Sequence, residues 1–236
     1  MTSRPSSQDI QTMFDRLAPK YDRFNRLASM GLDVYWRREA LRPVREGMRV
    51  LDLGCGTGDL ALLAARLVGG GEVVGLDFSA PMLEIARRRA RIDGKISGRV
   101  RFLLRKAEDL PVENEPYDLV VSGFVLRNLS EQIEPILAGV YRLLKPGGGV
   151  SFLDITEPPG RVRRFLWKIY MNTVVGLYGK LLFRKDYPVF YLTESAKRFL
   201  KVPDFVRLLE TAGFVDVSVR KFMLGVIVLY QAKKPN

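Results

Sequence analysis

The sequence predicts an α/β protein built on a seven-stranded mixed sheet, and three observations carry this prediction. Five apolar runs of strand length alternate with segments of helical periodicity within residues 46–156, which is the pattern of parallel strands joined by crossover helices. The last two apolar runs, residues 215–222 and 225–231, are joined by a short turn and predict an antiparallel pair. A glycine-rich turn after the first strand marks the place where ligands bind in a doubly wound sheet.

The glycine turn lies in residues 50–59, which read Val-Leu-Asp-Leu-Gly-Cys-Gly-Thr-Gly-Asp. An apolar run typical of a buried parallel strand opens it, and apolar residues at helical spacing follow in residues 60–68. The spacing is not that of a dinucleotide site, because Asp59 takes the third glycine position, and no P-loop motif follows. Asp52 and Asp59 add negative charge, which suits a cationic ligand such as S-adenosylmethionine with its ammonium and sulfonium groups.

The second strand, residues 72–77, ends in a carboxylate. Asp77 is placed to accept hydrogen bonds from two ribose hydroxyls, and such charge-assisted bonds are stronger than neutral ones. The alternative is that Asp77 caps the next helix, because Ser79-Ala80-Pro81 also has the pattern of a helix start. The neighbouring glycine turn favours the ribose.

Length and composition are those of one globular domain. At 236 residues, the chain is long enough for an α/β domain with a full core, and 47% hydrophobic and 27% charged residues are ordinary values. Residues 1–11 lack the apolar stretch of a secretory signal, and no segment runs long enough without charge to span a bilayer. The single cysteine, Cys55, fits a reducing compartment. We therefore expect a cytoplasmic protein.

The chain contains no histidine, which excludes a histidine base, a histidine metal ligand and a Ser-His triad. A general base must be Asp, Glu, Tyr, Lys or a positioned water, and we expect no metal. The net charge of +12 is compatible with nucleic acid, an anionic membrane or solubility alone. The distribution of this charge along the chain decides among the three.

The rest of the chain divides into a lid, further strands and helices, and an insertion. Residues 21–30 and 32–41 are aromatic and mixed in charge, so they form either two helices that lean on the sheet or a lid over cofactor and acceptor. The expected strands are residues 100–104, 117–122 and 150–155, and the expected helices begin near residues 10, 81, 133 and 205. We expect one domain, residues 1–236, with an N-terminal helical lid (1–45), a cofactor-binding core (46–156), a helical insertion after the fifth strand (157–203) and a terminal helix with a β-hairpin (204–236).

Three motifs at matching spacing connect the chain with a known family. They are Tyr21-Asp22 with Asn25, Ser29 and Trp36, then Leu126-Arg127-Asn128, and then Arg142-Leu143-Leu144-Lys145-Pro146-Gly147-Gly148. Together with the glycine turn and Asp77, they make the chain similar to the class I S-adenosylmethionine-dependent methyltransferases, which have a Rossmann-like fold. Within that class the chain resembles the ubiquinone/menaquinone biosynthesis C-methyltransferases, over nearly its whole length.

The resemblance implies that S-adenosylmethionine is the methyl donor and that the acceptor is a ring carbon of a demethylated polyprenyl quinol, with no metal. The cofactor residues it implies are Asp52, Gly54, Gly56, Thr57 and Gly58 around the amino acid moiety, Asp77 for the ribose with Phe78 next to it, Lys106 and Ala107 beside the adenine, and Gly123 in place of a usual Ser. The catalytic residues it implies are Arg127, Asn128, Asp154 and Tyr21. Arg127 would hold or polarise the quinol oxygen, and Asn128 would orient it. Alternatively, Arg127 pairs with Asp22 or Asp154 to close the lid.

Three sites depart from the family pattern. Phe24 stands where Met is usual and Asp33 where His is usual, and Asp154 and Thr156 stand where Glu-x-Ser usually follows the fifth strand. The change from His to Asp replaces a titratable cation with an anion, which leaves the exact acceptor open. Another small-molecule or lipid acceptor is therefore the main alternative.

Two other classes of protein are less favoured. A nucleic-acid methyltransferase would carry an Asn/Asp-Pro-Pro-Tyr signature or a catalytic cysteine, but the signature is absent and the only cysteine lies in the glycine turn. A protein that binds S-adenosylmethionine without catalysis is disfavoured, because candidate acceptor residues accompany the cofactor site. No nucleic-acid partner is expected, and a homodimer stays open.

The basic charge is concentrated in residues 161–201, which carry ten basic and two acidic side chains, a net +8 of the total +12. Residues 161–183 interleave this charge with apolar and aromatic side chains, among them Phe165, Trp167 and Tyr170, as in a helix that lies in a membrane interface. The segment therefore predicts peripheral docking on the anionic inner face of the membrane, where a polyprenyl quinol would be found. The alternative is an ordinary helical cap on the sheet with a solvated basic rim.

Overall fold

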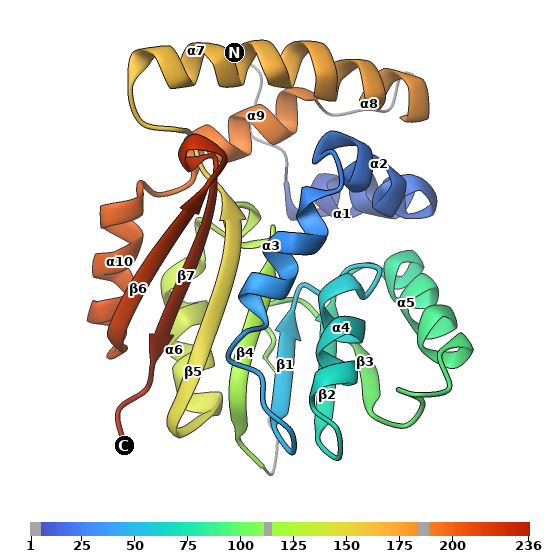
Figure 1. The fold of residues 1–236 in the computed structure, drawn as a ribbon, viewed down its shortest axis with the longest axis vertical. Helices are drawn as coiled ribbons and strands as arrows, with labels where there is room; N and C mark the ends of the chain where they lie inside the picture. The colour runs from blue at the N-terminus through green and yellow to red at the C-terminus, as the bar shows by residue number, and fades with distance from the viewer. Residues whose placement is uncertain (1–5, 111–114, 184–188) are drawn as a thin grey trace.

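The computed structural model of the protein describes residues 6–110, 115–183 and 189–236. A seven-stranded sheet in the order β3-β2-β1-β4-β5-β7-β6 runs through the molecule (Figure 1). The first five strands are parallel, and β7 runs antiparallel between β5 and β6, which confirms the predicted mixed sheet. The strands are β1 (Arg49–Leu53), β2 (Glu72–Asp77), β3 (Val100–Leu104), β4 (Tyr117–Gly123), β5 (Leu144–Ile155), β6 (Val215–Phe222) and β7 (Ile227–Lys233).

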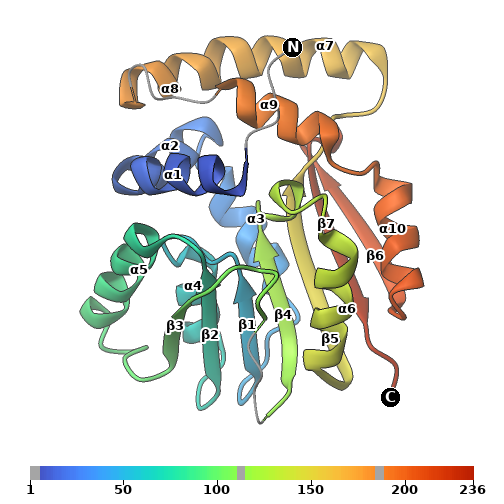
Figure 2. The same cartoon turned by 180° about the vertical axis from the view of Figure 1, so that it is seen from behind.

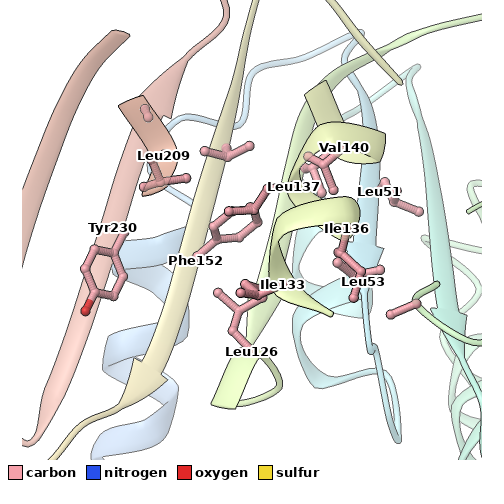
Figure 3. Close-up of a cluster of buried hydrophobic side chains, with 14 of the residues drawn as sticks. Leu51, Leu53, Leu126, Ile133, Ile136, Leu137, Val140, Phe152, Leu209 and Tyr230 are labelled. Atoms are coloured by element: carbon pink, nitrogen blue, oxygen red, sulfur yellow. The ribbon is translucent and has the colours of Figure 1, made fainter. Parts of the chain in front are cut away.

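Helices cover both faces of this sheet (Figures 1 and 2). One face carries α6 (Ile133–Leu143) and α10 (Val202–Thr211), and the other carries α3 (Leu32–Ala40), α4 (Asp59–Leu67) and α5 (Ala80–Ile92). Because central parallel strands need cover on both sides, most residues of β1, β2 and β4 are buried, whereas the edge strand β3 is partly exposed. Figure 3 shows the core on the α6 side, where Leu51 and Leu53 of β1, Ile136 and Leu137 of α6, and Phe152 of β5 lie together.

Further helices form a layer above the carboxyl ends of the parallel strands (Figures 1 and 2). They are α1 (Ser7–Leu17), the 3-10 turn η1 (Ala18–Lys20), α2 (Tyr21–Ala28), α7 (Arg161–Tyr170), the π-helical turn η3 (Met171–Val175), α8 (Gly176–Phe183) and α9 (Val189–Arg198). A separate apolar cluster joins them, in which Phe24 of α2 packs with Trp167, Met171, Val175 and Ala196. This layer stands where a doubly wound sheet binds its ligands.

The first helix begins earlier than the pattern from Ile10 predicted. Ser6 caps it, because its hydroxyl accepts a hydrogen bond from the backbone N–H of Asp9 (3.1 Å) while the Asp9 carboxylate accepts one from the backbone N–H of Ser6 (2.8 Å). This reciprocal capping box adds a polar first turn that apolar periodicity does not mark. Residues 1–5 lie outside the described residues.

Three other boundaries differ from the prediction. Strand β5 begins at Leu144, which pairs with Tyr117 before the ladder is interrupted, instead of at residue 150. Helix α10 begins at Val202, because Pro203 fits the first helical turn, where its missing N–H costs nothing. Strand β7 begins two residues late, because residues 223–225 form a turn of left-handed backbone.

Candidate active site

The glycine turn joins β1 to α4 at the carboxyl edge of the sheet. Gly54, Gly56 and Gly58 all have positive φ angles (74°, 53° and 88°), a conformation that other residues rarely adopt. A Cβ at Gly54 would lie 2.6 Å from the Val125 side chain, and one at Gly58 would lie 3.0 Å from that of Ala86. Gly54 and Gly58 therefore allow close packing, whereas the space beside Gly56 is open to a ligand.

A polar cavity of about 70 Å³ lies at this turn. Its lining includes these predicted residues: Asp52, Gly54, Gly56, Thr57, Asp77, Phe78, Ala107, Gly123, Tyr21 and Asn128. Two predicted cofactor residues lie elsewhere. Gly58 shapes the turn without lining the cavity, and the exposed Lys106 stands beside the lining residues Arg105 and Ala107.

Asp52 gives the clearest sign that the ligand of this cavity is cationic. Its side chain is buried, and neither carboxylate oxygen accepts a hydrogen bond of ordinary geometry from the described residues. Burial raises the pKa of Asp52 to about 7, although the backbone N–H of Ala61 and the charge of Arg37 act in the opposite direction. A buried carboxylate without partners is costly until a positive group meets it. The residues present therefore fit the ammonium end of S-adenosylmethionine.

Asp77 connects the glycine turn to the start of α5. One carboxylate oxygen accepts a hydrogen bond from the backbone N–H of Gly56 (2.8 Å), and the other accepts one from the backbone N–H of Ser79 (2.8 Å). The capping residue of α5 is Ser79, whose hydroxyl accepts from the N–H of Met82, so the capping alternative for Asp77 is wrong. Each oxygen of Asp77 keeps acceptor capacity for a ribose hydroxyl. Burial raises the pKa of Asp77 to about 6.

A larger cavity of about 330 Å³ adjoins the polar one. Phe14, Tyr21 and Phe124 line both cavities, so the two meet at these three rings. The larger cavity is lined mainly by apolar and aromatic side chains of the layer above the sheet, among them Met13, Leu17, Phe24, Trp36, Leu166, Trp167, Met171, Val175 and Leu192. Such a lining suits a flat apolar acceptor.

Arg127 is held at the wall of the larger cavity by Asp154. It lies in a 3-10 turn after β4, η2 (Leu126–Asn128). Its Nη1 donates to Asp154 Oδ1 (2.8 Å) and to the carbonyl of Phe124, and its backbone N–H donates to Asp154 Oδ2 (2.9 Å). Burial alone would lower the pKa of Arg127, but Asp154 raises it above the ordinary value. The predicted pairing with Asp154 is present, whereas Asp22 pairs with Arg89 instead.

One nitrogen of Arg127 has no partner. Its Nε is buried and makes no hydrogen bond with the described residues. A buried donor without a partner is costly, so this atom favours a ligand acceptor at the cavity wall. Tyr21 lies close enough to interact with Arg127 electrostatically. Burial nevertheless raises the pKa of Tyr21, and its phenol is therefore neutral at physiological pH.

Tyr191 of α9 is a site residue that the sequence did not reveal. Its hydroxyl donates a hydrogen bond to Asn128 Oδ1 (2.9 Å), and its side chain lines the larger cavity. Arg37 of α3 was missed as well, although it lines the polar cavity and its guanidinium lies 5.1 Å from the centre of the Phe124 ring. Only the docking of α9 and α3 brings these residues to the site, so no local motif could have marked them.

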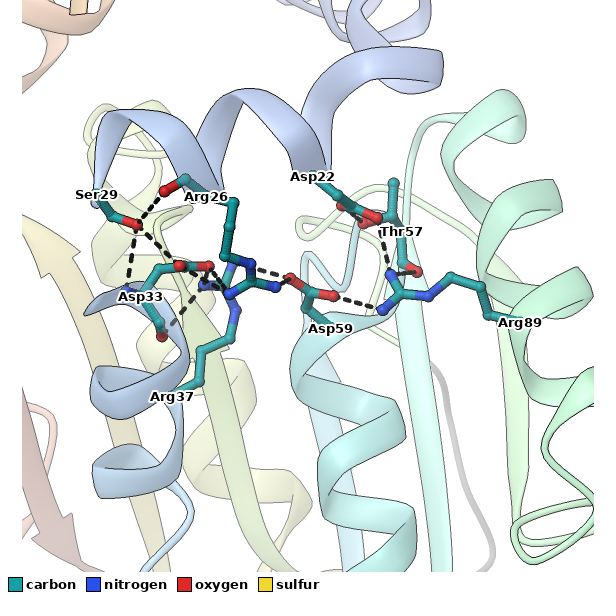
Figure 4. Close-up of polar contacts among 8 residues, drawn as sticks. All are labelled: Asp22, Arg26, Ser29, Asp33, Arg37, Thr57, Asp59 and Arg89. Atoms are coloured by element: carbon teal, nitrogen blue, oxygen red, sulfur yellow. Dashed lines mark hydrogen bonds and ion pairs between the residues drawn. The ribbon is translucent and has the colours of Figure 1, made fainter. Parts of the chain in front are cut away.

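Charged groups connect α2 and α3 at the edge of the site (Figure 4). Both oxygens of the buried Asp33 accept hydrogen bonds from Arg26 Nη1 (2.8 Å each). Arg37 Nη1 (2.9 Å) and Ser29 Oγ (2.8 Å) donate to the same carboxylate. Asp33 therefore replaces the usual His of the family with an anion whose charge two arginines neutralise.

The network continues from these helices to the glycine turn and α5 (Figure 4). Arg89 of α5 donates to Asp22 of α2 (2.9 Å) and to Asp59 (2.7 Å), and the hydroxyl of Thr57 donates to Asp22. Burial would raise the pKa of Asp59, but Arg37 and Arg89 hold it below the ordinary value. The helices above the sheet are thus tied to the turn that contains the predicted cofactor residues.

The sheet order, and the buried Asp52 carboxylate near the end of β1 beside the glycine turn, are those of a class I S-adenosylmethionine-dependent methyltransferase. The chain belongs to the ubiE/COQ5 methyltransferase family, whose model matches residues 2–234. Within the parts of the chain that the structure describes, no three acidic, Cys or His side chains are grouped so that they could hold a metal ion.

Relatives of known activity support the family, and solved structures support the fold. The demethylmenaquinone methyltransferase of Lactiplantibacillus plantarum is 36% identical over 220 residues, which are 92% of this chain and 92% of that protein. That of Thermus thermophilus is also 36% identical, over 94% of this chain and 100% of its own length. Among solved structures, the [4+2]-cyclase SpnF superposes with a TM-score of 0.71 at 19% identity, over 100% of this chain and 98% of its own. Haemonchus contortus phosphoethanolamine N-methyltransferase 2 with S-adenosylmethionine gives 0.63 at 18% identity, over 86% and 52%. At these identities the structures show the fold alone.

Proposed function

We propose that the protein transfers the methyl group of S-adenosylmethionine to a ring carbon of a demethylated polyprenyl quinol, with a demethylmenaquinol as the first candidate. The observation that carries this proposal is the junction of a polar cavity and an apolar cavity at Phe14, Tyr21 and Phe124. A methyl donor in the polar cavity and a flat apolar ring in the apolar cavity would meet at these three side chains. The activity in the names of the bacterial relatives supports the same acceptor.

The cofactor would be held by the turn after β1 and by the end of β2. Asp52 offers its uncompensated carboxylate to the ammonium group, and Asp77 offers its remaining lone pairs to the ribose hydroxyls. Residues 1–45 act as a lid, since Asp22 of α2 pairs with Arg89 of α5 and Asp33 of α3 pairs with Arg26 of α2. The guanidinium groups of Arg26 and Arg37 also lie 3.7 Å and 3.8 Å from the carboxylate of Asp59, which begins α4 after the turn. When bound, the cofactor supplies an electrophilic methyl group for the ring carbon.

The side chains around the acceptor orient the quinol and stabilise its phenolate. Arg127, fixed by Asp154, donates a hydrogen bond to the quinol oxygen and lowers the cost of its negative charge. The phenolate would raise electron density at the ortho carbon, and the new bond from this carbon to the methyl group would form as the bond between the methyl group and the cofactor sulfur breaks. Loss of the ring proton to solvent would then restore the aromatic ring. Asn128 lines the polar cavity, so its amide would act on the ring from the cofactor side, with its oxygen held by Tyr191 of the larger cavity. The apolar wall excludes water, so that these interactions act in a low dielectric.

Incubation of the purified protein with labelled cofactor and reduced demethylmenaquinone tests the proposal. We expect one methyl group on the ring of the product, identified by mass spectrometry. Menaquinol, whose ring carbon already carries the methyl group, is the matched control and should remain unlabelled. A labelled product from a membrane lipid extract that is not a quinol would favour the alternative acceptor class, another small molecule or lipid.

We also propose that the protein docks on the anionic cytoplasmic face of the membrane through α7 and α8. The outward side of these helices carries exposed apolar side chains at helical spacing: Val162, Phe165, Leu166, Ile169, Leu177 and Leu181. Exposed Arg161, Lys168 and Lys180 stand among them. An apolar row flanked by basic residues suits an interface with anionic lipid. No helix of the described residues could span a membrane.

One detail of the predicted docking segment is wrong. Trp167 is 4% exposed and packs inward with Phe24, and Tyr170 donates its hydroxyl to the carbonyl of Ala28 (2.6 Å). These rings fill the space between the helices and cannot lie at headgroup depth, where Phe165 is the aromatic residue available. Arg184, Lys185 and Asp186, which contributed to the charge count, lie outside the described residues.

Sedimentation with anionic vesicles at low salt tests the docking. Exchange of Arg161, Lys168 and Lys180 for Glu should abolish binding, because each basic residue contributes about 1 kcal/mol at an anionic surface. The matched control exchanges three exposed residues near the far end of α5, Arg88, Lys95 and Arg99, for Glu, and should retain more binding. Light scattering tests the competing explanation, in which a second copy of the chain covers the exposed apolar side of α7 and α8. A homodimer that Phe165→Asp dissociates would contradict membrane docking.

A further inference from the structure

The larger cavity, in which the acceptor would bind, reaches the surface between the start of α7 and the turn that joins β6 to β7. Three residues of the cavity lining are exposed, namely Arg163 and Leu166 of α7 and Leu224 of the turn. Leu166 is 52% exposed and Leu224 is 64% exposed, so both belong to the lining and to the outer surface. Side chains of this kind form the rim of an opening.

The same two segments are fixed side by side. Thr156, which follows β5 in the segment that leads to α7, donates from its hydroxyl to the carbonyl of Gly225 (3.0 Å) and from its backbone N–H to that of Val226 (2.8 Å). A Cβ at Gly225 would lie 3.1 Å from the ring of Pro159. Figures 1 and 2 show the turn between β6 and β7 close to the chain that leads into α7.

The turn holds an apolar side chain outward at a conformational cost. Met223 and Leu224 have positive φ angles of 46° and 58°, and a left-handed conformation costs a residue with a Cβ roughly 1–2 kcal/mol. Burial inside the protein does not offset the conformational cost at Leu224, because most of its side chain is exposed. Contact with lipid would offset this cost, and Val162 and Phe165 at the start of α7 are likewise apolar and exposed.

The size of the cavity limits how much of an acceptor it can enclose. A volume of about 330 Å³ lies at the low end of the range for ligand pockets, roughly 300–1,000 Å³. It suits a ring system with the first part of a substituent. A long isoprenoid tail must therefore leave the cavity, and the exposed apolar rim is where a tail meets apolar surface on its way out.

We propose that the opening between α7 and the β6–β7 turn is a portal that receives the acceptor ring-first from the bilayer, while the apolar tail stays in the lipid. This inference rests on the proposed function, because it takes the acceptor to be a quinol with a long tail. Leu166 and Leu224 flank the tail at the rim. Arg163 meets the lipid headgroups beside it.

Photo-crosslinking locates the tail directly. The probe is a demethylmenaquinone with a diazirine on its second isoprene unit, reduced and placed in anionic vesicles with the full chain and S-adenosylhomocysteine. We expect the label, located by peptide mass spectrometry, within residues 158–166 and 223–226. Label in residues 10–30 of the lid, or on lipid alone, would overturn the portal. Methylation of the same probe with active cofactor is measured separately, and its failure would overturn the proposed function instead.

A pair of leucine variants gives a second readout. Leu224→Asp should lower kcat/KM for a long-tailed quinol in vesicles at least tenfold more than for a quinol with a single isoprene unit in solution. Leu67→Asp, which changes a leucine of α4 that is 50% exposed, should affect both substrates alike. Equal losses on both substrates for Leu224→Asp would mean that Leu224 only shapes the cavity, and the portal would be wrong.

Discussion

The guanidinium of Arg127 and the carboxylate of Asp154 form an ion pair of 2.8 Å between side chains that are 3% and 0% exposed. Removal of one partner from such a pair leaves a buried charge uncompensated, which costs roughly 3–5 kcal/mol. Truncation of Arg127 would therefore confuse loss of fold with loss of function. A variant that keeps the charge is needed to examine its role.

Arg127→Lys is expected to keep the fold and the cofactor affinity but to lose most turnover. A lysine ammonium can still pair with Asp154 as a point charge, but it cannot also present the planar donors of a guanidinium to the quinol oxygen. We expect kcat to fall on the order of 100-fold, as for loss of a donor that stabilises an oxyanion. Calorimetry with S-adenosylmethionine provides the control. Normal turnover of the variant would exclude Arg127 from the reaction.

Tyr191→Phe removes the hydroxyl that holds Asn128 and leaves the ring in place. We expect kcat to fall by about tenfold with little change in thermal stability, since one neutral hydrogen bond contributes about 1 kcal/mol. Tyr170→Phe is the matched control, because its side chain lines the same cavity and its hydroxyl also donates a hydrogen bond, but to the carbonyl of Ala28. If the two variants lose equal activity, the role assigned to Tyr191 is incorrect.

The binding of S-adenosylmethionine should strengthen as pH rises from 5 to 7. In the free protein, burial raises the pKa of Asp52 to about 7 and of Asp77 to about 6, above their values in the unfolded chain. The folded free protein therefore holds protons that the unfolded chain releases, and its stability falls as pH rises through this window. A cationic ligand favours the ionised carboxylates, so binding should release protons.

Calorimetry at pH 6.5 in two buffers with different ionisation enthalpies measures this release. Asp52→Asn should abolish most of it, weaken cofactor binding, and stabilise the free protein at pH 8, because an amide avoids the cost of a buried charge. Proton uptake in place of release, or affinity that does not vary with pH, would contradict the assignment of Asp52 to the ammonium group.

Local patterns were sufficient to predict the sheet and the cofactor turn. Val50, Leu51 and Leu53 give β1 an apolar pattern that only Asp52 interrupts, and the glycines after it need a backbone conformation that few other residues accept. Both signals lie within ten residues of sequence. The site residues Arg37 and Tyr191 gave no such signal, because α3 and α9 bring them to the cavities only when the chain folds.

The orientation of α7 could not be predicted for a different reason. Phe165 and Trp167 are both large and aromatic, yet Phe165 is 63% exposed and Trp167 is buried. The apolar side chains of α7 that stand at helical spacing, Val162, Phe165, Leu166 and Ile169, are the exposed ones, so the periodicity marks a face of the helix without indicating whether protein or lipid covers it. The packing of Trp167 against Phe24, a residue far away in sequence, decides which face is covered.

Asp33→Asn is expected to destabilise the protein by about 3 kcal/mol and to loosen the lid. The change leaves Arg37, whose side chain is 7% exposed, without its 2.9 Å partner, and a buried charge that loses its partner is costly. Arg26 also loses its ion pair with Asp33, but its side chain is 41% exposed, so water screens the charge that remains. Urea denaturation measures the stability, and the dissociation rate of S-adenosylmethionine, which should rise, reports on the lid.

Glu84→Gln, which breaks an ion pair with Arg91 between side chains that are 68% and 71% exposed, is the control and should cost less than about 1 kcal/mol. Equal effects of the two substitutions would mean that the Asp33 network contributes nothing beyond a surface ion pair.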